Sequence, residues 1–151
     1  MMYKVLFICH GNICRSPMAE FMMKDMVSRR GIAENFEIAS AAVSREELGN
    51  PVYPPARAIL KQYGISCSGK YARQMTVQDY EYYDLLICMD NSNMRNMLRI
   101  VGGDPDGKMK MLMGYTSRGG EVSDPWYTGD FEGVWDDIHC GLEALLQDLG
   151  F

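Results

Sequence analysis

The chain has 151 residues, of which 47% are hydrophobic and 23% charged, so we expect a single globular domain over residues 1–151. The net charge of −5 argues against a nucleic-acid partner, because general nucleic-acid binders carry a basic excess. No signal-peptide pattern is present and no stretch approaches the ~18 apolar residues of a membrane span, so we expect a cytoplasmic protein without a membrane partner.

Apolar segments alternate between strand-like and helix-like patterns along the chain. Strands are predicted over residues 3–9, 36–42, 84–89 and 108–113, the last of them nearer an edge. Helices are predicted from Ser16, as the N-cap, to about residue 30, over 56–63, from an Asn91 or Ser92 cap to 101, and over 134–149. A short helical turn is expected at 76–82, and loops at 44–55 and 114–130.

This alternation predicts an α/β fold with a doubly wound, four-stranded parallel sheet and helices on both faces. In such sheets ligands bind beyond the carboxyl ends of the strands. The loop that follows the first strand leaves the sheet at that end. It is therefore the first place to look for a site.

The segment CHGNICRS, from Cys9 to Ser16, lies between the first strand and the first helix. A strand, a tight turn with glycine and a helix start build an anion cradle from backbone N–H groups. The N–H groups, the helix end and Arg15 favour a thiolate at Cys9, which can attack phosphorus. The planar fork of Arg15 can clamp two phosphate oxygens. We interpret the segment as a phosphate-binding loop with its own nucleophile.

The other residues of this loop are expected to shape it and to contact the substrate. Gly11 permits a backbone that points N–H groups inward, and Asn12 tolerates a left-handed conformation while its amide braces the loop. Ser16 can donate a hydrogen bond to the Cys9 sulfur. The substrate-binding set is completed by His10, Ile13 and Cys14.

The remaining cysteines do not indicate a second site. Cys67 and Arg73 repeat the spacing of Cys9 and Arg15, but no apolar strand precedes this copy and no hydroxyl follows its arginine, so we interpret the spacing as chance. Five cysteines scattered over the chain do not form a disulfide framework or a zinc-binding pattern. We expect no metal and no cofactor.

Attack by a thiolate requires a proton for the leaving oxygen. Asp104 and Asp124 both precede proline, but Asp104 comes before the fourth strand and so belongs to the amino end of the sheet. Asp124 follows that strand, at the end where Cys9 lies. We predict that Asp124 is the general acid and later the base, with Trp126 and Tyr127 walling the pocket.

CHGNICRSPMAE resembles the active-site loop of the low-molecular-weight protein tyrosine phosphatases, whose pattern is C-x-G-N-x-C-R-S-P. The resemblance continues through SAAVS at 40–44, ARQ at 72–74, CMDNSN at 88–93 and DPWY at 124–127. It implies a four-stranded parallel sheet with flanking helices and hydrolysis of phosphotyrosine in protein substrates through a cysteinyl-phosphate. We expect a monomer or a weak dimer. By the same matching Cys9 is the nucleophile, Arg15 the phosphate clamp and Asp124 the acid.

Other residues take roles from the same resemblance. Asn12, Ser16 and Ser40 are similar to the loop-bracing residues of the family. Cys14 resembles the partner that traps oxidised Cys9 as a reversible disulfide.

Several positions depart from the family pattern. Lys70 stands where the family often has histidine, and the aromatic residue that often lines the pocket near Glu46 is missing. Trp126 replaces the more usual tyrosine and still serves as a wall. Ile13 favours phosphotyrosine, because the related protein-arginine phosphatases tend to carry threonine there.

Other functions remain open on this pattern. A thiol-dependent arsenate reductase of similar fold would need a relay of cysteines, for which Cys67 and Cys88 could serve, and would not need Asp124. A protein-arginine phosphatase would use the same loop. A flavodoxin-like electron carrier would use hydroxyls in place of the cysteine and arginine, and a phosphate-binding module would lack turnover.

Overall fold

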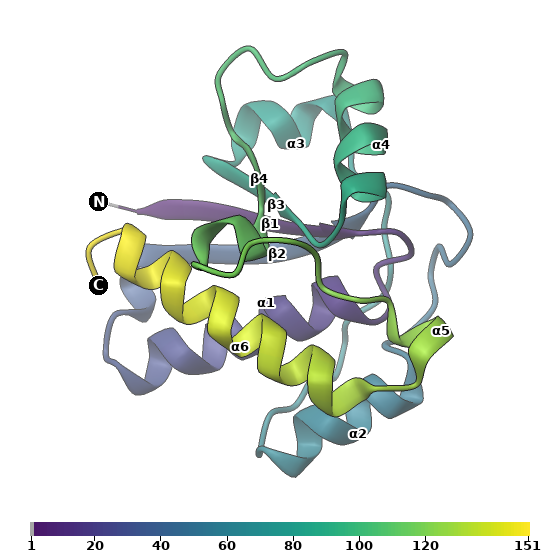
Figure 1. Ribbon diagram of the computed structural model, residues 1–151, viewed down its shortest axis with the longest axis vertical. Coiled ribbons are helices and arrows are strands. Elements are labelled where there is room, and N and C mark those ends of the chain that lie inside the picture. The colour runs from purple at the N-terminus through teal and green to yellow at the C-terminus, as the bar shows by residue number, and fades with distance from the viewer. Residues whose placement is uncertain (1) are drawn as a thin grey trace.

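Four parallel strands form one sheet in the computed structural model, which describes residues 2–151 (Figure 1). The strands are β1 (Tyr3–Cys9), β2 (Phe36–Ala42), β3 (Leu85–Cys88) and β4 (Met109–Met111). They lie in the order β2-β1-β3-β4, so β1 is central and β4 is an edge strand. The predicted parallel sheet is confirmed. β4 is shorter than expected, because a 3-10 turn, η2 (Leu112–Tyr115), follows it at once.

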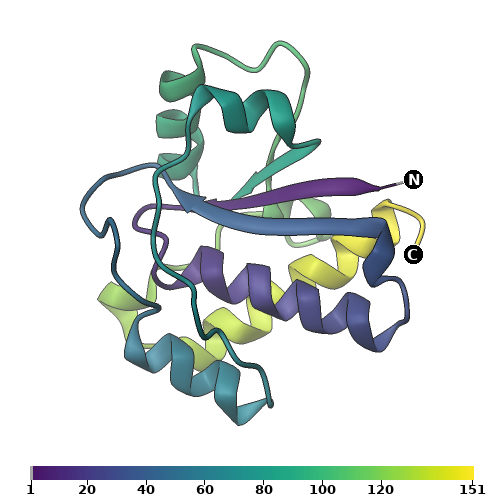
Figure 2. The same ribbon diagram turned by 180° about the vertical axis from the view of Figure 1, so that it is seen from behind.

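Helices cover both faces of the sheet, as predicted (Figures 1 and 2). One layer contains α1 (Arg15–Arg29), α2 (Pro54–Gln62) and α6 (Phe131–Asp148), and the other contains α3 (Val77–Tyr82) and α4 (Asn91–Val101). Alternate residues of β1 serve the two layers. Val5 and Phe7 belong to the core with α1 and α6, whereas Leu6 and Ile8 pack with α4. β1 is therefore buried on both sides, which fixes the loop that leaves it.

Two predicted N-caps were wrong, by two residues for α1 and by one or two residues for α4. α1 begins at Arg15 without a side-chain cap, because the Ser16 hydroxyl is engaged in the loop. α4 is capped by Asp90, whose carboxylate accepts from the Asn93 N–H at 2.7 Å, and not by Asn91 or Ser92. Three short elements were not predicted: η1 (Ala33–Asn35), η2 at the end of the expected fourth strand, and α5 (Pro125–Thr128) inside the expected 114–130 loop.

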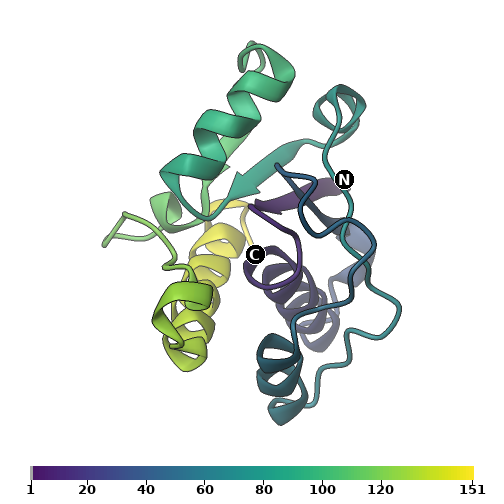
Figure 3. The same cartoon turned by 90° about the vertical axis from the view of Figure 1, so that its right-hand side faces the viewer.

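The carboxyl ends of β1 and β3 point toward one end of the molecule. Figure 3 views this end and shows the purple loop after β1 between α5 and the segment that enters α2. Asp104 lies elsewhere, in the turn before β4, where it accepts from the Tyr80 hydroxyl at 2.7 Å and the Lys108 N–H at 2.8 Å. No helix within residues 2–151 is long and apolar enough to cross a membrane.

Candidate active site

Asn12 holds the loop after β1 in shape. Its backbone is left-handed, with φ of 59°, and its side chain is buried. The amide nitrogen donates to the hydroxyls of Ser16 at 2.8 Å and Ser40 at 2.9 Å, and the amide oxygen accepts from the Arg73 N–H at 3.2 Å. A buried amide with all these partners satisfied offsets the cost of the left-handed backbone. The expected bracing by Asn12, Ser16 and Ser40 is therefore present as contacts.

The structure adds a packing role for Gly11. Its φ is not in the left-handed region, and that conformation falls on Asn12 instead. A Cβ added at Gly11 would lie 3.2 Å from Cγ of Glu47. A side chain at position 11 would therefore press on Glu47, since the loop after β2 packs closely against Gly11.

Cys9 ends β1 and its sulfur faces the start of α1. The sulfur lies 3.0 Å from the Ser16 hydroxyl. Because the Asn12 amide already donates to that hydroxyl, the hydroxyl hydrogen is available to the sulfur. α1 also has no side-chain cap and no acidic residue in its first turn, so its first N–H groups can serve an anion. Sulfur and anion site adjoin one another.

Arg15 lies buried at the floor of the site. Nη1 donates to Asp90 at 2.8 Å and to the Val122 carbonyl at 2.9 Å, and Nη2 lies 3.6 Å from Asp124. Burial alone would lower the pKa of this guanidinium, but the negative charges of Cys9, Asp90 and Asp124 outweigh burial and raise it. The floor therefore keeps a permanent positive charge.

Asp124 reaches the same site from the far end of the chain. It caps α5: Oδ1 accepts from the Trp126 N–H at 3.0 Å, while Oδ2 faces Arg15. The side chain is 31% exposed, so water can reach it. Capping fixes one oxygen and leaves the other directed at the cavity, which is the placement that a proton donor needs.

Two further cysteines lie near this charge cluster. Burial, followed by the charge on Cys9, raises the pKa of the Cys14 thiol strongly. Burial, followed by the charge on Asp90, raises the pKa of Cys88 to about 12. Both therefore stay protonated at neutral pH. A buried neutral thiol at Cys88 fits a core residue better than a member of a redox relay.

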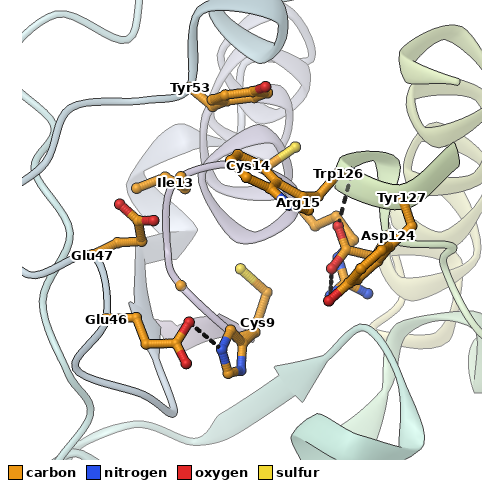
Figure 4. Close-up of a pocket in the computed structure, with 12 residues that line it drawn as sticks. Cys9, Ile13, Cys14, Arg15, Glu46, Glu47, Tyr53, Asp124, Trp126 and Tyr127 are labelled. Carbon is orange, nitrogen blue, oxygen red and sulfur yellow. Dashed lines mark hydrogen bonds and ion pairs between the residues drawn. The ribbon is translucent and has the colours of Figure 1, made fainter. Parts of the chain in front are cut away.

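A cavity of about 430 Å³ opens over the loop (Figure 4). Every predicted loop residue lines this cavity except Asn12 and Ser16, which lie behind the loop and brace it. Asp124, Trp126 and Tyr127 line the same cavity. Tyr53, whose ring centroid lies 5.1 Å from that of Trp126, was not predicted from the sequence. Tyr53 thus supplies an aromatic wall that the chain lacks near Glu46.

Lys70 supports the loop from behind, through Ser40. Its ammonium donates to the Ser40 carbonyl at 2.9 Å and lies 3.4 Å from the Glu20 carboxylate, which accepts from the Ser40 hydroxyl at 2.6 Å. Burial lowers the pKa of Lys70, although Glu20 opposes the shift. The bracing therefore reaches Ser16 through Ser40 and Asn12. Glu20 was not predicted, because the partners that tie it to the loop, Ser40 and Lys70, are distant in the chain.

Comparisons with known proteins agree with this geometry. Residues 4–150 match the family model described as low molecular weight phosphotyrosine protein phosphatase. The chain is 37% identical to the low molecular weight protein-tyrosine-phosphatase YfkJ of Bacillus subtilis, over 98% of this chain and 96% of that protein. It is 39% identical to the human low molecular weight phosphotyrosine protein phosphatase, over 95% and 93% respectively.

A crystal structure of YfkJ superposes with a TM-score of 0.94 over 99% of this chain and 95% of that one. The likeness extends over the sheet and over the segments that carry the site. Fold, site geometry and sequence comparisons all lead to the same family.

Proposed function

We propose a mechanism from the premise that this chain belongs to the low-molecular-weight phosphotyrosine protein phosphatase family and is a protein-tyrosine phosphatase. Its substrate is a phosphotyrosine-containing protein, and hydrolysis runs through a phosphoryl group held on Cys9. A single domain over residues 1–151, a monomer or weak dimer, and a cytoplasmic location stay predictions. The observation that carries the proposal is the meeting of Cys9, Arg15 and Asp124 in one cavity.

The first step transfers the phosphoryl group to the protein. The Cys9 thiolate attacks phosphorus while the loop N–H groups and Arg15 hold the phosphate oxygens and stabilise the charge of the transition state. As the P–O bond to the tyrosine ring breaks, Asp124 gives its proton to the leaving oxygen. Tyr53 and Trp126 flank the ring that departs.

The second step returns the protein to its starting state. Asp124, now a carboxylate, takes a proton from a water molecule that attacks phosphorus, and the S–P bond breaks. The Ser16 hydroxyl, 3.0 Å from the sulfur, donates to the thiolate as it leaves. Inorganic phosphate is released, and Asp124 again carries the proton needed for the next cycle.

Three matched peptides that carry phosphotyrosine, phosphoarginine or phosphoserine test the substrate class. We expect the phosphotyrosine peptide to be hydrolysed and Cys9→Ser to lose that hydrolysis while circular dichroism shows an intact fold. Preferred hydrolysis of the phosphoarginine peptide would make the chain an arginine phosphatase. Thiol-dependent reduction of arsenate without phosphatase activity would make it an arsenate reductase. Full activity in Cys9→Ser would exclude Cys9 as the nucleophile.

Reversible oxidation forms part of the same proposal. Peroxide converts the Cys9 thiolate to a sulfenic acid, which removes the Cys9 charge that helps to raise the pKa of Cys14. The Cys14 thiol then displaces water from the sulfenic acid to form a disulfide. Two equivalents of an added thiol reduce that disulfide again. We expect Cys14→Ser to lose the recovery of activity that thiol gives after peroxide treatment. Equal recovery in wild type and Cys14→Ser would exclude the disulfide.

A further inference from the structure

The entrance of the active-site pocket has two chemically different sides (Figure 4). The aromatic side consists of Tyr53, Trp126 and Tyr127, and the opposite side carries Glu46 and Glu47, which belong to the loop between β2 and α2. We call Glu46 and Glu47 the acidic rim. Aromatic rings suit the tyrosine ring of a substrate. The acidic rim must face parts of the substrate protein outside that ring.

The charges of the acidic rim lack a fixed cation. Glu46 lies 3.0 Å from the His10 ring, which is a half-exposed group and charged only when protonated. Glu47 accepts a hydrogen bond from the neutral amide of Asn50. Within residues 2–151, no lysine or arginine forms an ion pair with either carboxylate. Arg15 cannot serve them, since it lies at the floor against Asp90 and Asp124.

The acidic rim is held beside the phosphate loop. The N–H and hydroxyl of Ser44 both donate to the His10 carbonyl, at 3.1 and 2.9 Å. The side chain of Glu47 packs over Gly11. Glu46 has 70% of its side chain exposed, so a substrate can reach it at little cost. The loop is anchored and its carboxylates remain accessible.

We propose that the acidic rim selects phosphotyrosine sites that have a lysine or arginine close to the phosphotyrosine in the chain. The basic side chain would pair with Glu46, displacing His10, or with Glu47. An acidic neighbour would instead meet two like charges and Asp124. Exposed ion pairs of this kind correspond to roughly a two- to fivefold preference for each carboxylate, and salt weakens them. This inference deepens the proposed function and rests on it.

The test compares phosphotyrosine peptides of one parent sequence in which a single neighbour, from two positions before to two after the phosphotyrosine, is lysine, alanine or glutamate. We expect kcat/KM in the order lysine, alanine, glutamate at one or more of these positions, with differences that shrink in high salt. The lysine-to-glutamate ratio should fall toward one in the Glu46→Gln/Glu47→Gln double variant. Glu34→Gln is the matched control, because Glu34 is exposed in η1, before β2 begins, and its ratio should equal that of wild type.

Three results would overturn the inference: equal kcat/KM for all peptides, a preference for glutamate, or a lysine preference that persists in the double variant. A double variant that loses activity on every peptide by the same factor would show that the acidic rim only holds the loop. Absence of hydrolysis of every peptide by wild type would instead contradict the proposed function itself.

Discussion

Asp124 and Asp104 are both followed by proline, yet they have different surroundings. Asp124 caps α5, with one oxygen facing Arg15 across 3.6 Å. Asp104, in the turn that leads into β4, accepts from the Lys108 and Met109 N–H groups and from the Tyr80 hydroxyl of α3. The Asp124 carboxylate therefore lies at the cavity, whereas the Asp104 carboxylate stabilises a turn.

The two aspartates should therefore respond in opposite ways to the same substitution. Asp124→Ala removes the proposed proton donor, so kcat on phosphotyrosine peptides should fall by about 10²–10⁴-fold while thermal stability changes little. Asp104→Ala should leave kcat nearly unchanged and lower the free energy of unfolding by about 2 kcal/mol, because buried donors lose their acceptor. Steady-state kinetics and denaturant titration on both variants check this. The reverse ranking in kcat would contradict the assigned acid.

Asp104 also makes stability depend on pH. Burial alone would raise its pKa, but the hydrogen bonds from Tyr80, Lys108 and Met109 outweigh burial and lower it. The carboxylate is thus favoured in the folded state, and its contribution is fully present above the unfolded pKa of about 3.9. It is lost as pH falls through the lowered folded pKa. The stability gap between wild type and Asp104→Asn, measured by denaturant titration, should shrink below about pH 4; a constant gap would contradict this.

Several site residues could be predicted because they share one short segment or one known pattern. Cys9, Arg15 and the other members of the loop stand next to one another, and Asp124 follows from the order of the strands. Tyr53, Asp90 and Glu20 could not be predicted in this way. The partners that place them in the site lie far away in the sequence, and an isolated tyrosine or carboxylate has no pattern that indicates whether it faces a pocket.

Helix α6 packs against η2 through a glycine, and this contact connects the C-terminal helix to the end of β4. A Cβ added at Gly141 would lie 2.6 Å from Cγ of Leu112, which is fully buried. Alanine ordinarily favours a helix over glycine by about 1 kcal/mol. Here the overlap opposes that preference, because a close-packed core has no room for the methyl group.

We expect the overlap to dominate, so Gly141→Ala should lower the free energy of unfolding by about 1–3 kcal/mol. Gln147→Ala is the control, since Gln147 is exposed on the same helix, and it should change stability by less than about 0.5 kcal/mol. Denaturant titration of both variants measures the difference. A stabilised Gly141→Ala would show that α6 and η2 move apart at little cost.

Long apolar patterns predicted the strands and the main helices, whereas the first residue of each helix could not be predicted exactly. Ser16, Asn91 and Asp90 are all residue types that cap helices well. Ser16 does not cap α1, because its hydroxyl contacts Cys9 and Asn12 instead, and those contacts exist only in the folded chain. α5 has four residues, too few for a periodic pattern. Its start at Asp124 nevertheless sets the direction of the carboxylate in the active site.

The active site exists only in the folded chain, because its parts come from segments that are distant in sequence. β1 ends at Cys9, the proposed nucleophile, Asp90 after β3 holds Arg15, and α5 begins after Asp124. A parallel sheet brings the carboxyl ends of β1 and β3 to one edge, and the order of β3 and β4 places the later loop beside them. Although the molecule carries a net charge of −5, the bottom of its active-site pocket is positively charged because Arg15 lies there.

A phosphoryl group on Cys9 is the central claim, and the Asp124→Ala protein offers the most direct test. An aryl phosphate with a good leaving group needs little help from an acid in the first step. Loss of the base slows the second step, so the intermediate should accumulate. Rapid quenching followed by peptide mass spectrometry should find one phosphoryl group on the peptide that contains Cys9, and none in a Cys9→Ser/Asp124→Ala control. Turnover without this adduct, or an adduct on another residue, would contradict the account.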